Sequence, residues 1–208
     1  MRNSMIGLLT GLLLSASVHA ADYAADVHYA RLSQTQPVQT GDKIEVLEVF
    51  WYGCPHCYTL EPHIQNWLND KPANAEYVVM PAILRDSWEI HARSYYSFEA
   101  LGILDKVHTP FFDAIHKERR RFRSVDEVAD WVSGLGVEKS SFFDAYDSFA
   151  VETKLRQARV MGDRYELTGV PTMIVDGKYR TTGTMAGGHA AMMDVVNFLV
   201  AKAAEERN

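Results

Sequence analysis

The sequence contains very little cysteine, with two residues in a chain of 208. Structural zinc sites usually need about four ligands, and the second cysteine pair that commonly completes them is absent. The eight histidines show no finger-like spacing with the cysteines, and haem attachment would need a histidine where Tyr58 stands. A chain of this length needs no disulfide staples, and a bridge between Cys54 and Cys57 would close a loop of only about four residues. The pair is therefore a poor structural bridge and a good candidate for a redox centre that uses no metal or other cofactor.

Excess positive charge is also absent. The formal net charge is −6 at pH 7, which argues against general nucleic-acid binding. One local exception is the basic run at residues 117–123, which holds five Lys and Arg side chains. Such runs are usually a solvated helix end or loop, and contact with acidic lipid or a membrane partner is the alternative.

Beyond residue 20 the sequence has no apolar run long enough to span a bilayer. The first twenty residues read as a secretory signal peptide, in which Arg2 is the positive start, residues 5–14 are the apolar core and residues 18–20 form a small-residue cleavage site. Cleavage near Ala20 would leave 188 of the 208 residues. We therefore expect a soluble exported protein, which in a bacterium is a periplasmic one.

The two cysteines form a C-x-x-C motif between a predicted strand and a predicted helix. Residues 44–51 are apolar on both alternation faces, which predicts a central strand in which Glu48 is out of place. Residues 58–68 predict a helix. Cys54 should therefore lie at the helix N-cap, with Pro55 at the first helical position.

This position predicts an acidic thiol at Cys54. The backbone N–H groups of His56 and Cys57 can donate to its sulfur, and the helix dipole and a charged His56 favour the thiolate. Together these effects should lower its pKa by about 1–3 pH units. Cys57, one turn inside the helix, should be more buried and less acidic than an exposed Cys54. Because a stabilised thiolate stabilises the reduced dithiol, the disulfide should be a strong oxidant that is donated to substrates.

The rest of the chain predicts a split α/β unit interrupted once by helices. Residues 77–80 are a second buried strand, which completes a β-α-β crossover. Residues 87–167 have helical patterns and no convincing strand. Strands return at residues 172–175 and 178–181, around an Asp176-Gly177 hairpin turn, and a C-terminal amphipathic helix follows.

In five segments the sequence resembles the DsbA family of periplasmic thiol:disulfide oxidoreductases. These are residues 46–57, Glu61, residues 100–107, residues 169–172 and residues 176–179. The resemblance covers nearly the whole chain after residue 20 and implies an α/β thioredoxin fold, a central mixed sheet flanked by helices, with an all-helical insertion. The implied division is a signal peptide at 1–20, a thioredoxin-like domain at 21–84 and 167–208, and the insertion at 85–166.

The resemblance also assigns roles at the site. It implies that Cys54 is the nucleophile and the attacked sulfur, and that Cys57 is the resolving thiol. It further implies that Pro171 is a cis-proline beside the cysteines, in a loop where Gly169 and Val170 pair with an extended substrate. Sequence alone indicates only a turn before a strand at these residues.

Glu48 matches a buried acidic residue of the family beneath the active site. A carboxyl whose pKa is raised by burial could relay protons to Cys57, and the alternative is a carboxylate that a partner satisfies and that only tunes the site. Glu61 is a weaker candidate, because one exposed acidic residue on a helix is ordinary. The family's lysine near the second strand has no match, since Glu76 stands there, and the partner of Glu48 stays open.

Several apolar side chains near the motif could bind unfolded substrates. They are Trp51, Tyr52, Trp88 and Met185. The alternative, which we expect for Trp88 especially, is that they belong to the core.

We expect a monomeric periplasmic dithiol oxidase that donates the Cys54–Cys57 disulfide to reduced exported proteins. The resemblance implies reoxidation by a membrane-embedded partner of the DsbB type. One alternative is a disulfide reductase or isomerase, which the family usually builds with an added dimerisation module for which 188 residues leave no room. Another is a redox-inert chaperone or binding module on the same fold.

Overall fold

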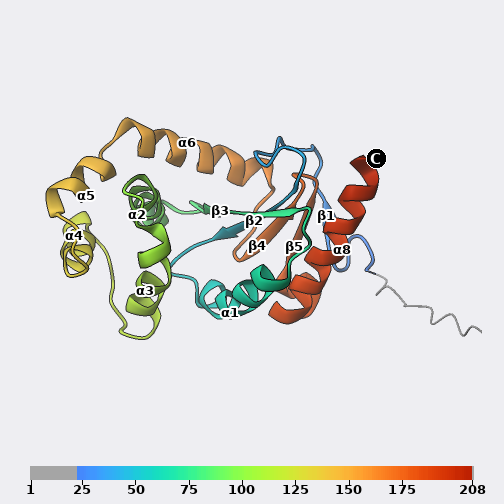
Figure 1. The fold of residues 1–208 in the computed structure, drawn as a ribbon, viewed down its shortest axis with the longest axis horizontal. Helices are drawn as coiled ribbons and strands as arrows, with labels where there is room; N and C mark the ends of the chain where they lie inside the picture. The colour runs from blue at the N-terminus through green and yellow to red at the C-terminus, as the bar shows by residue number, and fades with distance from the viewer. Residues whose placement is uncertain (1–22, 208) are drawn as a thin grey trace, which may run out of the picture.

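The sheet is built around the strand that leads into the C-x-x-C motif. The structure is a computed structural model that describes residues 23–207, so the predicted signal peptide lies outside the described residues. β2 (Ile44–Phe50) is buried along its whole length, as its two-sided apolar pattern predicts. It pairs in parallel with β3 (Ala75–Pro81) and antiparallel with β4 (Thr172–Val175). β2 is therefore an interior strand of a mixed sheet (Figure 1).

A tight hairpin and a short edge strand complete the sheet. β5 (Tyr179–Thr182) pairs with β4 and with β1 (Ala30–Arg31), which gives the order β1-β5-β4-β2-β3. The β4–β5 turn has Asp176 at φ 56° and Gly177 at φ 60°, as the Asp-Gly signal predicts. A Cβ on Gly177 would lie 2.1 Å from the carbonyl oxygen of Gln36. The turn thus needs glycine both for its backbone conformation and for space.

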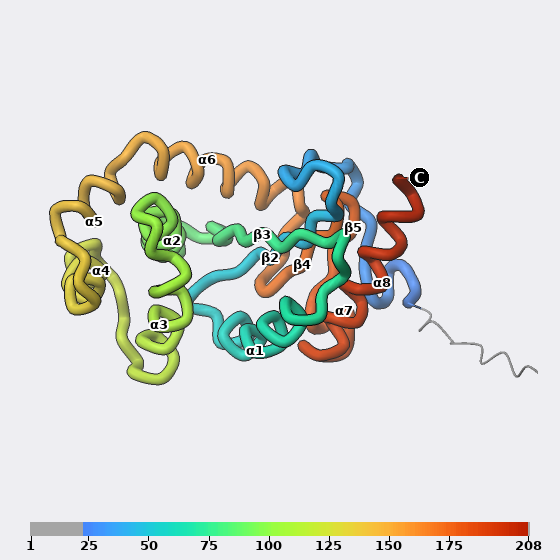
Figure 2. Tube along the Cα trace, viewed as in Figure 1, coloured from blue at the N-terminus to red at the C-terminus, as the bar shows by residue number. Residues whose placement is uncertain are grey.

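Helices cover both faces of this sheet (Figures 1 and 2). On one face lie α1 (Pro55–Asp70) and α8 (His189–Arg207), preceded by the short α7 (Gly183–Ala186). Their apolar side chains share a core cluster with Ile44, Val46, Met173 and Val175 of the sheet. On the other face, α6 (Phe149–Arg164) contributes Leu155, Ala158 and Met161 to a cluster with Leu47 and Ile174.

Between β3 and β4 the described chain forms helices and no strand. After η1 (Asp86–Trp88) come α2 (Glu89–Ala100), α3 (Leu104–His116), α4 (Val125–Ser133), α5 (Lys139–Tyr146) and α6. Helices α2 to α5 lie at one end of the sheet, and α6 runs back along the sheet (Figure 1). The predicted all-helical insertion is confirmed. None of the helices in the described part of the chain is both long and apolar enough to cross a membrane.

One helix in this block carries a proline in its interior. α3 begins at Leu104, so Pro110 lies beyond the first helical position that proline favours. A capping box precedes α4, since Ser124 and Glu127 each accept a hydrogen bond from the other's backbone N–H.

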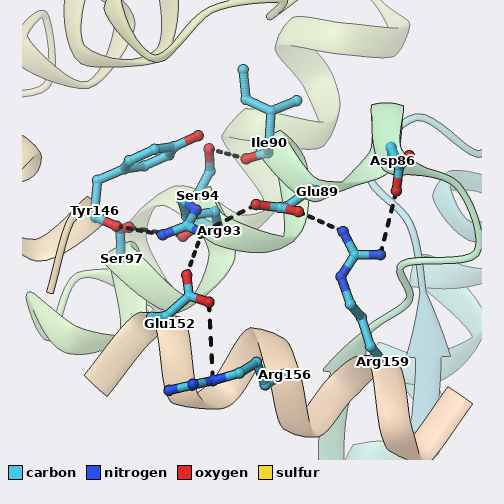
Figure 3. A network of polar contacts seen from close by, with 10 residues as sticks. All are labelled: Asp86, Glu89, Ile90, Arg93, Ser94, Ser97, Tyr146, Glu152, Arg156 and Arg159. Carbon is cyan, nitrogen blue, oxygen red and sulfur yellow. Dashed lines mark hydrogen bonds and ion pairs between the residues drawn. The ribbon is translucent and has the colours of Figure 1, made fainter. Parts of the chain in front are cut away.

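An ion-pair network joins η1 and α2 to α6 (Figure 3). Arg93 of α2 lies 3.1 Å from Glu89 and 2.6 Å from Glu152 of α6. Arg159 of α6 pairs with Glu89 and, at 3.6 Å, with Asp86 of η1. The Arg93 side chain is only 16% exposed, so its contacts are screened less than those of the fully exposed Asp86. The network fixes the start of the helical block against α6.

Two glycines provide a matched test of the fold. We expect Gly177→Ala to lower the free energy of unfolding by more than about 1 kcal/mol, because the new Cβ meets Gln36 and the turn needs positive φ. Gly162→Ala, inside α6, should raise it by about 0.5–1 kcal/mol, because its Cβ meets Leu167 at an ordinary 3.8 Å. Urea unfolding of both variants measures the difference. A Gly177→Ala protein as stable as wild type would contradict this account of the hairpin.

Candidate active site

Cys54 occupies the N-cap of α1, where β2 leads into the helix. Its backbone is extended, with φ −89° and ψ 116°, and Pro55 is the first helical residue, as predicted. The prediction of an exposed sulfur is wrong, because Cys54 is only 8% exposed. The loop before β4 covers it, and the neutral Cys54 thiol donates a hydrogen bond to the carbonyl oxygen of Val170 at 3.4 Å. Both cysteines are free thiols, so the structure describes the reduced form.

The two thiols have opposite acid strengths. The pKa of Cys54 is lowered to about 6, chiefly by a hydrogen bond that the Cys57 thiol donates to its sulfur. Burial works against this, and the backbone N–H groups of Cys57 and His56 and the charge of His56 lower the pKa further. Cys57 is fully buried, and burial followed by its hydrogen bond to Cys54 raises its pKa well above the usual value. Only Cys54 therefore ionises near neutral pH.

The sequence predicts the contributions of the backbone N–H groups and of His56 to the pKa of Cys54, but not the largest one, the hydrogen bond from the Cys57 thiol. The C-x-x-C spacing contains the signal, since residues three apart lie on one side of a helix and can bring their side chains into contact. The prediction that Cys57 is more buried and less acidic than Cys54 is confirmed.

The loop that covers Cys54 contains a cis peptide bond between Val170 and Pro171, as the resemblance implies. Pro171 is buried, and the carbonyl oxygen of Gly169 accepts a hydrogen bond from the Thr172 hydroxyl at 2.8 Å. Within residues 23–207, no backbone-to-backbone hydrogen bond involves Val170. Its main chain is thus available beside the Cys54 sulfur.

Glu48 lies on β2 and is completely buried. Burial first, and then the charge of Glu61, raise its pKa to about 8, although a hydrogen bond from the Tyr77 hydroxyl lowers it. Tyr77 donates to Oε2, whereas Oε1 has no hydrogen-bond partner among the described residues. Because the charge of Glu48 is one of the causes that raise the pKa of Cys57, the two groups are electrostatically linked. A carboxyl in this position holds its proton at neutral pH.

Glu61 is buried at 7% exposure, so the prediction of an ordinary exposed acid is wrong. It faces inward because it lies four residues after Cys57 on α1 and shares its side of the helix. His108 of α3 places Nε2 3.5 Å from Glu61 and Nδ1 2.8 Å from the Tyr52 hydroxyl. No local motif in the sequence predicts a role for His108.

The partner of Glu48, which the sequence leaves open, is the neutral Tyr77 hydroxyl. Glu61 pairs with His108. Glu76, where the resemblance leads us to expect a lysine, forms an ion pair with Lys43 at 2.7 Å.

The aromatic side chains proposed either to bind substrate or to belong to the core differ from expectation in their burial. Tyr52 is 1% exposed, so it is a core residue and offers no surface to a substrate. Trp51 is half-buried and stacks in parallel on Trp88, with ring centroids 4.3 Å apart and an interplanar angle of 3°. Trp88 is also half-buried rather than core. Gly53 permits the stack, because a Cβ there would lie 2.3 Å from the Trp51 ring.

Two cavities flank the loop at residues 168–170. One, of about 570 Å³, contains His56, Arg180, Met185 and His189 in its lining. The other, of about 540 Å³, is lined by Cys54, Pro55, Trp51, Trp88, Leu84, Arg85, Leu167 and the loop itself. No group of three or more His, Cys, Asp or Glu residues that could hold a metal ion was found in the described part of the chain.

The basic run lies away from these cavities. Its five Lys and Arg residues are exposed, and Phe122 within it is buried in the helical core. Lys117 pairs with Asp113 and Arg120 with Glu118, each at 2.9 Å. This arrangement matches the predicted solvated helix end and loop.

One family shares this fold and this motif. The model of the DSBA-like thioredoxin domain matches residues 75–199. The thiol:disulfide interchange protein DsbA of Pseudomonas aeruginosa is 40% identical over 200 residues, covering 94% of this chain and 95% of that protein. The chain belongs to the DsbA family. A further DsbA, from Burkholderia cepacia, is 35% identical over 211 residues and covers 100% of both chains.

Solved DsbA structures share the architecture. A crystal structure of Pseudomonas aeruginosa DsbA has a TM-score of 0.85 and 39% identity, covering 90% of this chain and 98% of that one. The DsbA oxidoreductase of Xylella fastidiosa has a TM-score of 0.80 and 27% identity, covering 86% and 96%. The thioredoxin fold with a helical insertion is confirmed, and this DsbA-family protein is a thiol:disulfide oxidoreductase with Cys54 and Cys57 as its C-x-x-C pair.

Replacing Cys57 in two ways tests the hydrogen bond that makes Cys54 acidic. Cys57→Ala removes the donor, whereas Cys57→Ser keeps a hydroxyl donor. We expect the pKa of Cys54 to be about 1–2 pH units higher in the alanine variant than in the serine variant, since a hydrogen bond to a charged group is worth about 1.5–3 kcal/mol. Thiolate ultraviolet absorbance against pH measures both values. Equal values would show that the Cys57 thiol is not the main cause.

Glu48→Gln tests the buried carboxyl through stability. The folded protein holds the Glu48 proton up to about pH 8, whereas an unfolded chain releases it near pH 4.5. Between these values the folded state binds the Glu48 proton more often than the unfolded chain does, so the contribution of Glu48 to wild-type stability falls as pH rises. The variant lacks this loss, and its stability relative to wild type should increase by about 2–3 kcal/mol between pH 5 and pH 7.5.

Urea unfolding of the reduced proteins at the two pH values measures this difference. Glu76→Gln is the matched control, because Glu76 is exposed and its pKa is lowered by Lys43, so its titration lies below this window. A difference between Glu48→Gln and wild type that does not change with pH would contradict the raised pKa of Glu48.

Proposed function

We propose that this protein is a periplasmic dithiol oxidase that donates the Cys54–Cys57 disulfide to reduced exported proteins. The observation that carries the direction is the separation of the two thiol pKa values, with Cys54 at about 6 and Cys57 well above its usual range. Stabilising the thiolate stabilises the reduced pair, which makes the disulfide more oxidising by about 30 mV for each ~1.4 kcal/mol. The signal-peptide pattern at residues 1–20 supports an exported, oxidising setting.

The reaction is two thiol–disulfide exchanges. A substrate thiolate attacks the Cys54 sulfur, the Cys54–Cys57 bond breaks, and its electron pair goes to Cys57. The substrate's second thiolate then attacks the sulfur of the substrate's first cysteine in the mixed disulfide. The bond to Cys54 breaks, and Cys54 leaves as a thiolate. The substrate loses two electrons and two thiol protons, and the Cys54–Cys57 pair gains the electrons. The low pKa of Cys54 makes it a good leaving group in the second exchange.

Glu48 supplies a proton to Cys57 in the first exchange. Cys57 leaves as a buried thiolate, which its raised pKa makes unfavourable until it is protonated. The Glu48 carboxyl, with a pKa of about 8, carries a proton at neutral pH. A cavity of about 460 Å³ has Tyr77, Glu61 and His108 in its lining. Through this cavity, solvent returns a proton to Glu48.

The main chain of the covering loop binds the substrate. Val170 has a carbonyl oxygen on the Cys54 thiol and a backbone with no other main-chain partner among the described residues. An extended substrate that pairs with Gly169 and Val170 brings its own cysteine to Cys54 without requiring a particular sequence. The charge of His56 favours the Cys54 thiolate and so makes the Cys54–Cys57 disulfide more oxidising.

Each turnover leaves Cys54 and Cys57 reduced, so the cycle needs an electron acceptor. Membership of the DsbA family supports a membrane-embedded reoxidant of the DsbB type, which takes up the two electrons. We propose that the protein works with this partner as a monomer.

Oxidative refolding tests the proposal. The oxidised protein should restore disulfides to a reduced, unfolded multi-disulfide protein, with one disulfide transferred per molecule, whereas Cys54→Ser should lose at least about 1,000-fold in rate because the attacked sulfur is gone. Arg121→Ala, on the exposed basic run, is the control and should keep the wild-type rate. Equal performance by wild type and Cys54→Ser would favour a redox-inert chaperone. Faster rearrangement of scrambled disulfides than oxidation of thiols would favour an isomerase.

A further inference from the structure

The two cavities beside the site differ in their access to the reacting sulfur. Cys54 lines the cavity that also contains Trp51 and Trp88, which we call the tryptophan cavity. The cavity on the other side of the loop contains His56 but not Cys54 in its lining. A segment covalently joined to Cys54 therefore lies at the mouth of the tryptophan cavity.

Ring stacking and ion pairs to α6 hold the aromatic wall of the tryptophan cavity in place. The Trp51 and Trp88 rings are parallel, 4.3 Å between centroids, and Gly53 leaves the space that the Trp51 ring occupies. Trp88 ends η1, and the ion pairs of Asp86 and Glu89 with Arg159 attach this segment to α6 (Figure 3). A fixed aromatic wall can take an aromatic or large apolar side chain at a low entropic cost.

The rim of the cavity carries one unpaired positive charge. Leu84 is 36% exposed, and Arg85 beside it is also exposed. The Arg85 side chain has no hydrogen bond or ion pair with another described residue, and no carboxylate lines the cavity. The nearest acid in sequence, Asp86, is paired with Arg159 on α6 (Figure 3). The charge of Arg85 is thus free to meet a carboxylate on a bound chain.

We propose that the tryptophan cavity is a substrate subsite for an aromatic or large apolar side chain next to the reacting cysteine, with an acidic neighbour that pairs with Arg85. This inference rests on the proposed function, in which an extended substrate pairs with Val170. Such a chain crosses the loop at Cys54, so its residues on one side of the cysteine lie over the tryptophan cavity. The protein therefore oxidises cysteines in acidic–aromatic contexts faster than those in basic contexts.

The test uses reduced peptides with two cysteines, in which the residues beside one cysteine are Phe-Asp, Phe-Lys, Ala-Asp or Ala-Lys. Each pair is placed before or after that cysteine. Second-order rate constants for oxidation are measured with the wild-type protein and with Arg85→Glu, Trp88→Ala and Arg121→Glu. Arg121→Glu is the matched control, since it makes the same charge change on an exposed residue outside the cavity. The rate with dithiothreitol, measured for each protein, corrects for any change at Cys54 itself.

Wild type should oxidise a Phe-Asp peptide fastest in one of the two placements. Arg85→Glu should slow Asp peptides by about five- to tenfold and speed Lys peptides, because charges at the rim act mainly on association rate. Raised salt should reduce this difference, and Arg121→Glu should change the ranking by less than about twofold. Trp88→Ala should slow Phe peptides while leaving Ala peptides closer to wild type.

An unchanged peptide ranking in Arg85→Glu would overturn the subsite and leave the proposed function intact. Because Arg85 is exposed, this variant decides the matter even if Trp88→Ala fails to fold. A wild-type protein that reacts with dithiothreitol but oxidises none of the peptides would instead count against the proposed function.

Discussion

A single negative charge has to be held on Cys54 and kept off Cys57, and the arrangement of the site follows from this constraint. At the start of α1, the Cys57 thiol and the backbone N–H groups of Cys57 and His56 all lower the pKa of Cys54. The same burial that surrounds Cys57 penalises a second thiolate a few ångströms away. The C-x-x-C pair is therefore asymmetric by position, although its two side chains are chemically identical. Donor geometry at a helix end and depth in the core are enough to give the two sulfurs different chemistry.

The acids beneath the cysteines obey the same constraint. Glu48 has a hydroxyl partner rather than a cation, so nothing in its contacts forces it to ionise. Glu61 raises its pKa further, and His108 in turn provides Glu61 with a partner from the helical insertion. The insertion thus contributes, through His108, to the electrostatics around Glu48 and Glu61. A cation in place of Tyr77 would favour the ionised form of Glu48 and weaken its capacity to hold a proton at neutral pH.

Local patterns in the sequence predicted much of this arrangement, and contacts between distant segments account for the rest. The strand before Cys54, the N-cap position and the Asp-Gly hairpin depend on neighbours in the chain, and the sequence predicted all three. The burial of Cys54 depends on a loop more than a hundred residues away. The burial of Tyr52 likewise involves His108, which belongs to a distant helix with no motif of its own. Two spacings in the sequence do carry unused signals: the three-residue spacing of the cysteines, which lets Cys57 donate to Cys54, and the four-residue spacing of Glu61 from Cys57.

The burial of Cys54 beneath the Val170 loop also affects how readily its thiolate is oxidised. A thiolate with a pKa of about 6 is the form of cysteine that peroxides convert to sulfenic and then, irreversibly, to sulfinic acid, and susceptibility rises with exposure. At 8% exposure, with Val170 over the sulfur, little of Cys54 is open to a small oxidant that makes no other contact. An extended polypeptide can replace the Val170 contact with main-chain hydrogen bonds of its own. The loop that we propose as the substrate-binding element therefore also protects the thiolate between turnovers.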